Sequence, residues 1–183
     1  MPVRRKIIVY IATSADGYIA RPDGDVEWLN RRHPAEYGIH SFYRTIDTIL
    51  WGRKTYDWAL AYDKEHGNKG GIFDTKVANY VFSRKPPKTA APGVEFVSLP
   101  VKSFARKLRA TPGKNIWMMG GGHLIASFLD AGEIDEFDIS VIPTFIGKGI
   151  PLVAPRHRDV SLHLLSSRKY PDGVVRLRYK VEK

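Results

Sequence analysis

Residues 120–125 of this chain read Gly-Gly-Gly-His-Leu-Ile, and they are its most informative stretch. A short apolar run, 116–119, precedes them and an amphipathic stretch follows, so the glycines are expected where a buried strand turns into a helix. Glycines let a ligand approach the backbone closely, and the free N–H groups at the start of a helix attract anions. The stretch therefore predicts a phosphate or pyrophosphate site. It matches only part of the dinucleotide fingerprint G-x-G-x-x-G, since Ile125 replaces the last glycine, and a plain tight connection is the alternative interpretation.

Length and composition restrict the class of protein. The chain has 183 residues, enough for one domain over 1–183 with a core that needs no disulfide. It has no cysteine, which excludes thiolate metal sites and cysteine nucleophiles, and its six histidines show no H-x-x-x-H spacing, so no metal site is expected. No run approaches the roughly 18 apolar residues of a membrane span. The apolar run after Lys6 is too short for a signal peptide and favours a first strand, so we expect a cytoplasmic protein without a membrane partner.

The chain is strongly basic, with 29 lysines and arginines against 19 acidic residues and a formal net charge of +10. Such a balance indicates an anionic partner: nucleic acid, an acidic membrane surface or a phosphorylated small molecule. The basic residues are scattered, whereas a nucleic-acid footprint needs one contiguous basic face with interleaved aromatic residues. A phosphorylated small molecule is therefore favoured, and nucleic acid is not expected to bind.

Apolar patterns predict alternating strands and helices. Strands are expected at 7–13, 47–51, 77–83, 94–97, 115–119 and 137–143. Helices are expected from Pro34 through the apolar residues up to Ile46, and at 53–60, 101–110 and 123–131, with an exposed loop at 63–71. Near the C-terminus, 162–165 and 175–181 flank a turn at 170–173 and predict an antiparallel hairpin. This order predicts an α/β fold, with a mostly parallel sheet, helices on both faces and the hairpin at one edge.

Two further clusters resemble anion sites. Gly-Arg-Lys-Thr at 52–55 follows a predicted strand and opens a predicted helix, and Ser-Arg-Lys at 83–85 follows another strand. In an open α/β sheet, ligands bind beyond the carboxyl ends of the strands, where these clusters and the glycine run all fall. Each alone is compatible with an ordinary strand exit. Together they favour one extended polyanion, such as a dinucleotide.

The residues carry a resemblance in their order and spacing. The chain resembles the dihydrofolate reductase superfamily and, within it, the riboflavin-biosynthesis reductase domain, which also forms the C-terminal half of bifunctional deaminase-reductases. That resemblance implies a dihydrofolate reductase-like three-layer sandwich and a single reductase domain, because the zinc ligands of the deaminase half are absent. It rests on Ser-Ala-Asp-Gly-Tyr-Ile-Ala at 14–20, Trp28, Gly-Arg-Lys-Thr-Tyr at 52–56, Val-Phe-Ser-Arg at 81–84, Gly-Gly-Gly at 120–122, Ile-Asp-Glu at 134–136, Pro143 and Gly-Lys-Gly at 147–149.

The resemblance implies NADPH as hydride donor and assigns a part of it to each cluster. The first cluster would hold the pyrophosphate and 2′-phosphate side: Gly52, Arg53, Lys54 and Thr55. Ser83 and Arg84 would hold the adenosine 2′-phosphate, for which a planar guanidinium is well suited. The third would hold the pyrophosphate next to the nicotinamide: Gly120, Gly121, Gly122, His123, Leu124 and Ile125. In the superfamily a cis peptide joins two glycines of this run, here Gly120 and Gly121.

Three carboxylates are candidates for managing the proton that accompanies hydride. Glu36 follows a Pro-Ala pair, as the carboxylate of dihydrofolate reductases does, and a buried carboxyl beside an apolar ring could have a raised pKa. An exposed glutamate in a first helical turn, interacting only with the helix dipole, is the alternative. Asp16 and Asp25 lie on the loop expected to close over the nicotinamide, although Asp16-Gly17 is also an ordinary turn sequence.

These features predict an NADPH-dependent reductase that acts on a pyrimidine or pterin. The expected substrate is 5-amino-6-(5-phosphoribosylamino)uracil or a relative. Two alternatives stay open: a true dihydrofolate reductase, which would consume dihydrofolate, and a non-enzymatic basic nucleic-acid-binding domain, whose affinity would fall steeply with salt. Pairing into a homodimer through sheet or hairpin surfaces is typical of proteins that this chain resembles.

Overall fold

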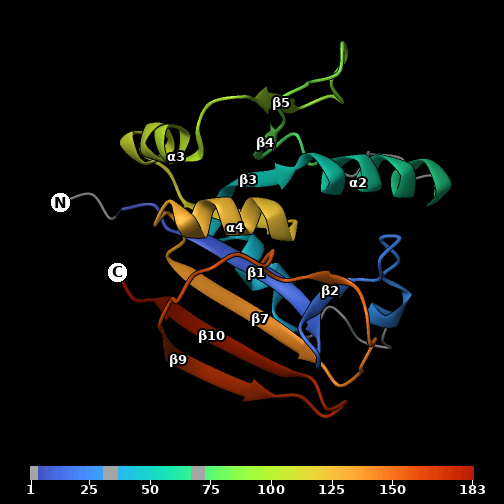
Figure 1. The fold of residues 1–183 in the computed structure, drawn as a ribbon. Helices are drawn as coiled ribbons and strands as arrows, with labels where there is room; N and C mark the ends of the chain where they lie inside the picture. Colours follow the sequence, from blue (N-terminus) through green and yellow to red (C-terminus); the bar gives the residue numbers. More distant parts are fainter. Residues whose placement is uncertain (1–3, 31–36, 67–72) are drawn as a thin grey trace.

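The computed structural model describes residues 4–30, 37–66 and 73–183, which form a sheet covered by helices (Figure 1). Eight strands follow the order β5-β4-β3-β6-β1-β7-β10-β9. The first six are parallel, whereas β10 is antiparallel to both β7 and β9. The strands of this sheet are β1 (Ile7–Ser14), β3 (Ile46–Gly52), β4 (Ala78–Phe82), β5 (Val94–Val97), β6 (Asn115–Gly120), β7 (Glu136–Ile142), β9 (Leu162–Lys169) and β10 (Val175–Val181).

The remaining elements cover the sheet or connect its strands. Two short strands, β2 (Tyr18–Ala20) and β8 (Ile150–Pro151), pair with each other outside the main sheet. The helices are the 3₁₀ turn η1 (Glu27–Leu29), α1 (Ile39–Tyr43), α2 (Arg53–His66), α3 (Val101–Ala110) and α4 (Gly122–Asp130). None of the described helices combines the length and the apolar character that crossing a bilayer demands.

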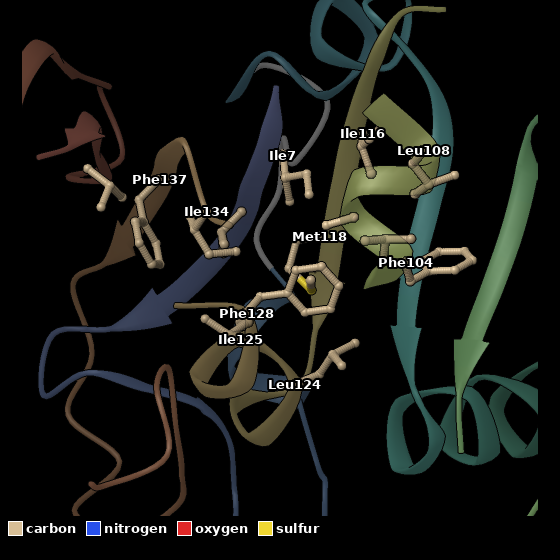
Figure 2. Packing of buried hydrophobic residues seen from close by; sticks show 14 of the residues in the cluster. Ile7, Phe104, Leu108, Ile116, Met118, Leu124, Ile125, Phe128, Ile134 and Phe137 are labelled. Carbon is tan, nitrogen blue, oxygen red and sulfur yellow. The ribbon is translucent and has the colours of Figure 1, made fainter. Parts of the chain in front are cut away.

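The central strands are apolar on both faces because helices cover both. Alternation along β1 places Ile7 and Val9 in the core under α3 and α4, and Ile8 in the core under α1 and α2. Figure 2 shows the first of these cores, in which side chains of α3 and α4 pack on the central strands. Those it labels include Phe104, Leu108, Leu124, Ile125 and Phe128 from the helices, with Ile7, Ile116 and Met118 from the strands.

The position of the two helix layers creates a topological switch point between β3 and β6. These strands are hydrogen-bonded neighbours, but β3 continues into α2 on one face and β6 continues into α4 on the other. Adjacent strands whose connections leave on opposite faces open a crevice at their carboxyl ends. We call the carboxyl ends of the six parallel strands the carboxyl edge. β3 ends at Gly52 and β6 at Gly120, and we call the space expected beyond these two glycines on this edge the crevice.

The predicted α/β fold, its mostly parallel sheet and the C-terminal hairpin are confirmed. Two helix predictions need correction. Of the described residues in the helix predicted from Pro34, only Ile39–Tyr43 are α-helical, because Gly38 has a left-handed φ of +91° and Ile46 is already the first residue of β3. Helix α2 runs to His66, so part of the predicted 63–71 loop is helical. The strands β2 and β8 and the turn η1 were not predicted.

Candidate functional site

The starts of α2 and α4 converge on the crevice at the switch point. A Cβ added to Gly52 would lie 3.2 Å from both the Gly120 carbonyl oxygen and the Gly121 nitrogen. A Cβ added to Gly121 would lie 3.2 Å from Thr55 Oγ1, which belongs to the first turn of α2. Since the first N–H groups of each helix have no carbonyl one turn back, both helices direct free donors to this space. The glycines thus let the two anion-attracting helix starts approach each other closely at the switch point.

The glycine run itself has the geometry that the sequence suggested. Gly120 has a φ of +109°, and the peptide bond between Gly120 and Gly121 is cis, as the resemblance implied. Gly122 allows another segment to cross the start of α4: a Cβ there would lie 2.3 Å from the Pro151 carbonyl oxygen, and its own carbonyl accepts a 3.1 Å hydrogen bond from the Ala154 N–H. The run is therefore a strand-to-helix junction against which the 150–154 segment packs closely at Gly122.

The other predicted residues of α4 differ in their accessibility. Leu124 and Ile125 are buried in the core, and their N–H groups donate to the Gly121 carbonyl at 2.9 and 3.1 Å. Their backbone donors are therefore engaged within the helix, and their side chains anchor α4 to the sheet. His123 is exposed, and its N–H belongs to the unpaired first turn. Of the stretch 122–125, Gly122 and His123 have the donors best placed for an anion.

Cations flank the crevice on α2 and on the connection after β4. Arg53 Nε donates to the Asp57 carboxylate at 2.8 Å and its Nη1 to the Lys85 carbonyl at 2.9 Å, so this guanidinium ties α2 to that connection. Lys54 and Arg84 are exposed, and no described residue forms an ion pair with either. Ser83 lies at the end of β4, where its N–H donates to the Val97 carbonyl at 3.0 Å. Two unpaired cations therefore stand beside the crevice.

An aromatic cluster occupies the neighbouring ends of β1 and β7. Tyr37, Tyr170 and Ile142 are buried there, and Ala12 and Trp28 pack against them. The Trp28 indole nitrogen, Nε1, is buried and meets no acceptor in the described part of the chain. A buried donor without an acceptor costs about 1–3 kcal/mol, so Trp28 Nε1 is a candidate donor for an acceptor of a ligand. We call this group of five residues the aromatic cluster.

A buried ion pair that sequence reasoning missed lies beside the aromatic cluster. Asp138, in the middle of β7, accepts two hydrogen bonds of 2.6 Å from Nε and Nη2 of Arg176 on β10. Tyr10 lies below Arg176, whose guanidinium carbon is 5.3 Å from the centre of its ring. The signal was present in the sequence: Asp138 interrupts an apolar strand, and Arg176 belongs to the alternating hairpin strand. Only the register of β7 against β10 reveals that they pair.

The candidate carboxylates differ in position. Glu36 lies outside the described residues. Asp16 accepts hydrogen bonds from the Gly147 N–H at 2.8 Å and the Ile146 N–H at 3.3 Å, and a hydrogen bond from Ser14 is the main cause that lowers its pKa. Asp25 binds Arg21 Nε at 3.0 Å and caps the N–H of Glu27 at 3.0 Å. Asp16 and Asp25 are therefore acceptors that hold loops, and a catalytic role for Asp16 stays a prediction.

The loop between β1 and β2 is fastened over the carboxyl edge. The Ala15 N–H donates to the Thr144 carbonyl at 2.9 Å, the Leu152 N–H donates to the Gly17 carbonyl at 3.1 Å, and β2 pairs with β8. Together with the Asp16 contacts, these bonds join 14–20 to 144–152. We call this arrangement the loop clasp. It covers the edge next to the crevice, where it would shield a bound ligand from water.

The donors at the crevice fit a dinucleotide and not a metal. Two helix starts, a glycine-lined space and unpaired cations at Lys54 and Arg84 suit phosphate groups. The described residues contain no group of three or more His, Asp or Glu side chains placed to hold a metal ion. The residues present therefore fit the phosphate groups of the predicted NADPH in charge and in hydrogen-bond donors.

Comparison with known proteins agrees with the architecture. A solved structure from Shewanella sp. PV-4, provisionally named for riboflavin biosynthesis, has a TM-score of 0.84 and 25% sequence identity and covers 97% of this chain and 99% of its own. The bifunctional diaminohydroxyphosphoribosylaminopyrimidine deaminase/5-amino-6-(5-phosphoribosylamino)uracil reductase of Thermotoga maritima has a TM-score of 0.72 at 17% identity. Its match covers 98% of this chain and 57% of the longer protein, so it shares the fold of one part.

Sequence relatives extend over nearly the whole chain. The uncharacterized protein YwjB of Bacillus subtilis is 33% identical over 173 residues, which are 94% of this chain and 96% of YwjB. The uncharacterized protein YyaP of the same organism is 32% identical over 181 residues, or 96% of this chain and 95% of YyaP. The profile of the RibD C-terminal domain matches residues 5–176. The chain therefore belongs to the RibD C-terminal domain family.

Proposed function

We propose that this protein is an NADPH-dependent reductase whose substrate is a pyrimidine, 5-amino-6-(5-phosphoribosylamino)uracil or a relative. Membership of the RibD C-terminal domain family supports a reductase of the riboflavin pathway. The observation that carries the cofactor assignment is the convergence of two helix starts at the switch point, with Lys54 and Arg84 unpaired beside it. A dinucleotide phosphate is the anion that would use all of these groups together.

In this proposal, different residues of the crevice bind different parts of NADPH. The N–H groups at the starts of α2 and α4 bind its pyrophosphate, and Thr55 Oγ1 adds a hydroxyl on the same side. Arg84 binds the 2′-phosphate, because its guanidinium is exposed and engaged with no described residue. When bound, NADPH supplies the hydride. Since β6 and β1 are adjacent, a nicotinamide at Gly120 and Gly121 would lie next to the end of β1.

The substrate heterocycle is assigned to the aromatic cluster, on the far side of β1 from the crevice. Apolar and aromatic walls exclude water there and orient a planar ring, and Trp28 Nε1 offers a donor for a ring carbonyl. Asp16 joins the two segments of the loop clasp, and the proton-managing role stays a prediction for Glu36, Asp16 and Asp25. Catalysis then rests mainly on positioning two planar reactants in a dry space, with one carboxyl handling the proton.

The first test measures binding of NADPH and NADH through quenching of tryptophan emission. Arg84→Ala should weaken NADPH about tenfold or more and leave NADH unchanged, because a charge-assisted phosphate contact is lost. Lys88→Ala is the matched control, since Lys88 is an exposed cation on the same connection. Turnover of the pyrimidine substrate and of dihydrofolate then separates the proposed activity from that of a dihydrofolate reductase. If neither nucleotide shows saturable binding, the cofactor assignment is wrong.

A further inference from the structure

The buried ion pair of Asp138 and Arg176 also links the hairpin strand β10 to the segment before α1. Asp138 is 4% exposed, and both of its oxygens accept from Arg176 at 2.6 Å in a two-pronged arrangement. Such a pair leaves one guanidinium nitrogen unused, and Arg176 Nη1 donates to the Tyr37 carbonyl at 3.0 Å. The hairpin strand β10 therefore reaches across the sheet to the residue that precedes α1 by two positions.

The Tyr37 carbonyl receives a second donor from the central sheet. Tyr10 Oη donates to it at 3.1 Å, and burial raises the pKa of Tyr10 to about 12, so the phenol stays protonated. The Tyr10 ring is fixed in turn by stacking on Phe42, with ring centres 4.3 Å apart. The Tyr37 carbonyl thus accepts hydrogen bonds from two side chains, one on β1 and one on β10. These two bonds fix the peptide that precedes the five-residue helix α1.

The next residue, Gly38, is shaped to the guanidinium. A Cβ at this position would lie 2.2 Å from Arg176 Nη1, and the φ of +91° is a conformation that side chains rarely adopt. The peptide and the guanidinium therefore meet without space for any side chain between them. Arg176 and Gly38 form a single contact that a substitution on either side would break.

Tyr37 is held at its other end by the same hairpin. Its hydroxyl donates to the Asp172 carboxylate in the turn between β9 and β10, and its ring packs edge-on against Tyr170 at a centre distance of 5.1 Å. Because Tyr37 is a wall of the aromatic cluster, the C-terminal hairpin sets the position of that wall. We propose that Arg176 is a positioning residue that fixes Tyr37 for substrate binding, an inference that rests on the proposed function.

The test uses Arg176→Lys with Arg178→Lys as matched control. Arg178 lies on the same face of the same strand and pairs with buried Glu136 at 3.1 Å and with Asp138 at 3.5 Å, whereas the hydrogen bond to the Tyr37 carbonyl comes from Arg176. Lysine at 176 can keep a charge contact with Asp138 but lacks the planar fork that also reaches Tyr37. We expect KM for the pyrimidine to rise about tenfold in Arg176→Lys, with kcat within about twofold and NADPH affinity unchanged. Arg178→Lys should leave all three unchanged.

A second variant protects the test against loss of folding. Tyr10→Phe keeps the ring stack and removes only the hydroxyl that donates to Tyr37, so KM should rise about threefold while the melting temperature falls by no more than about 4 °C. A purely structural role predicts the reverse: a lower melting temperature with an unaltered KM of the folded fraction. That result, or equal shifts in Arg176→Lys and Arg178→Lys, overturns the inference. A wild-type protein that binds NADPH but does not reduce the pyrimidine overturns the proposed function, and the inference with it.

Discussion

Asp16 has a structural role that follows from the hydrogen bonds its carboxylate accepts, and not from a proton it could donate. Its oxygens bind two N–H groups of the 144–152 segment, and its lowered pKa keeps it ionised across the range in which enzymes work. A group of this kind stabilises the folded state above its unfolded pKa, and that stabilisation is lost as pH falls through the folded pKa. The loop clasp should therefore loosen in acid.

Asp16→Asn should reveal this dependence on pH. The variant should be less stable than wild type by an amount that is constant above about pH 5 and shrinks below about pH 4, because only the wild-type carboxylate titrates there. Urea unfolding across this range measures the difference. Asp159→Asn, at an exposed position, is the control and should show no such trend. A stability difference that is the same at every pH would contradict the assigned role of Asp16.

Individual residues were predictable where their chemistry is local. Gly120 to Gly122, the cations Arg53 and Lys54, and Arg84 indicate strand exits by type and spacing alone, and the structure has strands ending at Gly52, Phe82 and Gly120; their role in binding a cofactor stays a prediction. The pairing of Asp138 with Arg176 was not predictable, because it depends on the register between strands 38 residues apart. The type of a residue shows which groups its side chain can bind. The register between neighbouring strands decides which of those groups lies within reach.

The elements that were predicted well are those with a strong period and a clear end. Helix α3 and strand β5 were predicted to the residue, since each shows its own apolar pattern between proline or glycine residues. Strands β2 and β8 contain only three and two residues, and each is a strand because it pairs with the other. Segments this short show no apolar period from which a strand could be predicted. Helix α1 was overestimated because the apolar spacing continues through Gly38, whose left-handed backbone interrupts the helix.

The start of α4 depends on the close crossing of the 150–154 segment. Gly122→Ala would place a Cβ 2.3 Å from the Pro151 carbonyl oxygen, and backbone cannot easily yield there. We expect a loss of about 2–3 kcal/mol in the free energy of unfolding and weaker NADPH binding, since the segment must move away from α4.

Gly132→Ala provides the comparison for that variant. It meets nothing within 4 Å, but has a φ of +70°, so it should cost about 1 kcal/mol through backbone strain alone. Chemical denaturation compares the two variants. Equal losses would mean that the crossing segment adapts, contrary to the packing seen at Gly122.

At the scale of the whole molecule, the edge strand β9 is not covered by any other described part of the chain. Every residue of β9 is exposed, including Leu162, Leu164 and Leu165 at 42–49%. An uncovered edge strand with apolar side chains favours pairing with another strand. We propose that a second copy of the chain covers β9, in line with the homodimer that the resemblance suggested.

Leu164→Lys should convert such a dimer to a monomer, because two added charges would face each other across the pairing. Leu99 is as exposed as Leu164 and follows β5, the strand at the opposite edge of the sheet. Leu99→Lys should therefore leave the oligomeric mass unchanged. Sedimentation velocity at micromolar concentration distinguishes the two states. A monomeric wild-type protein would contradict this pairing.

Asp135 brings the two described ends of the chain together. Its carboxylate binds Arg4 Nη2 at 3.7 Å and Lys183 Nζ at 2.9 Å, so both ends lie at the amino ends of the strands, on the left of Figure 1. The carboxyl edge with its crevice is at the opposite end of these strands. A partner domain fused genetically before β1 or after β10 would therefore leave the crevice accessible, which makes this architecture suited to shuffling between single-domain and multidomain proteins.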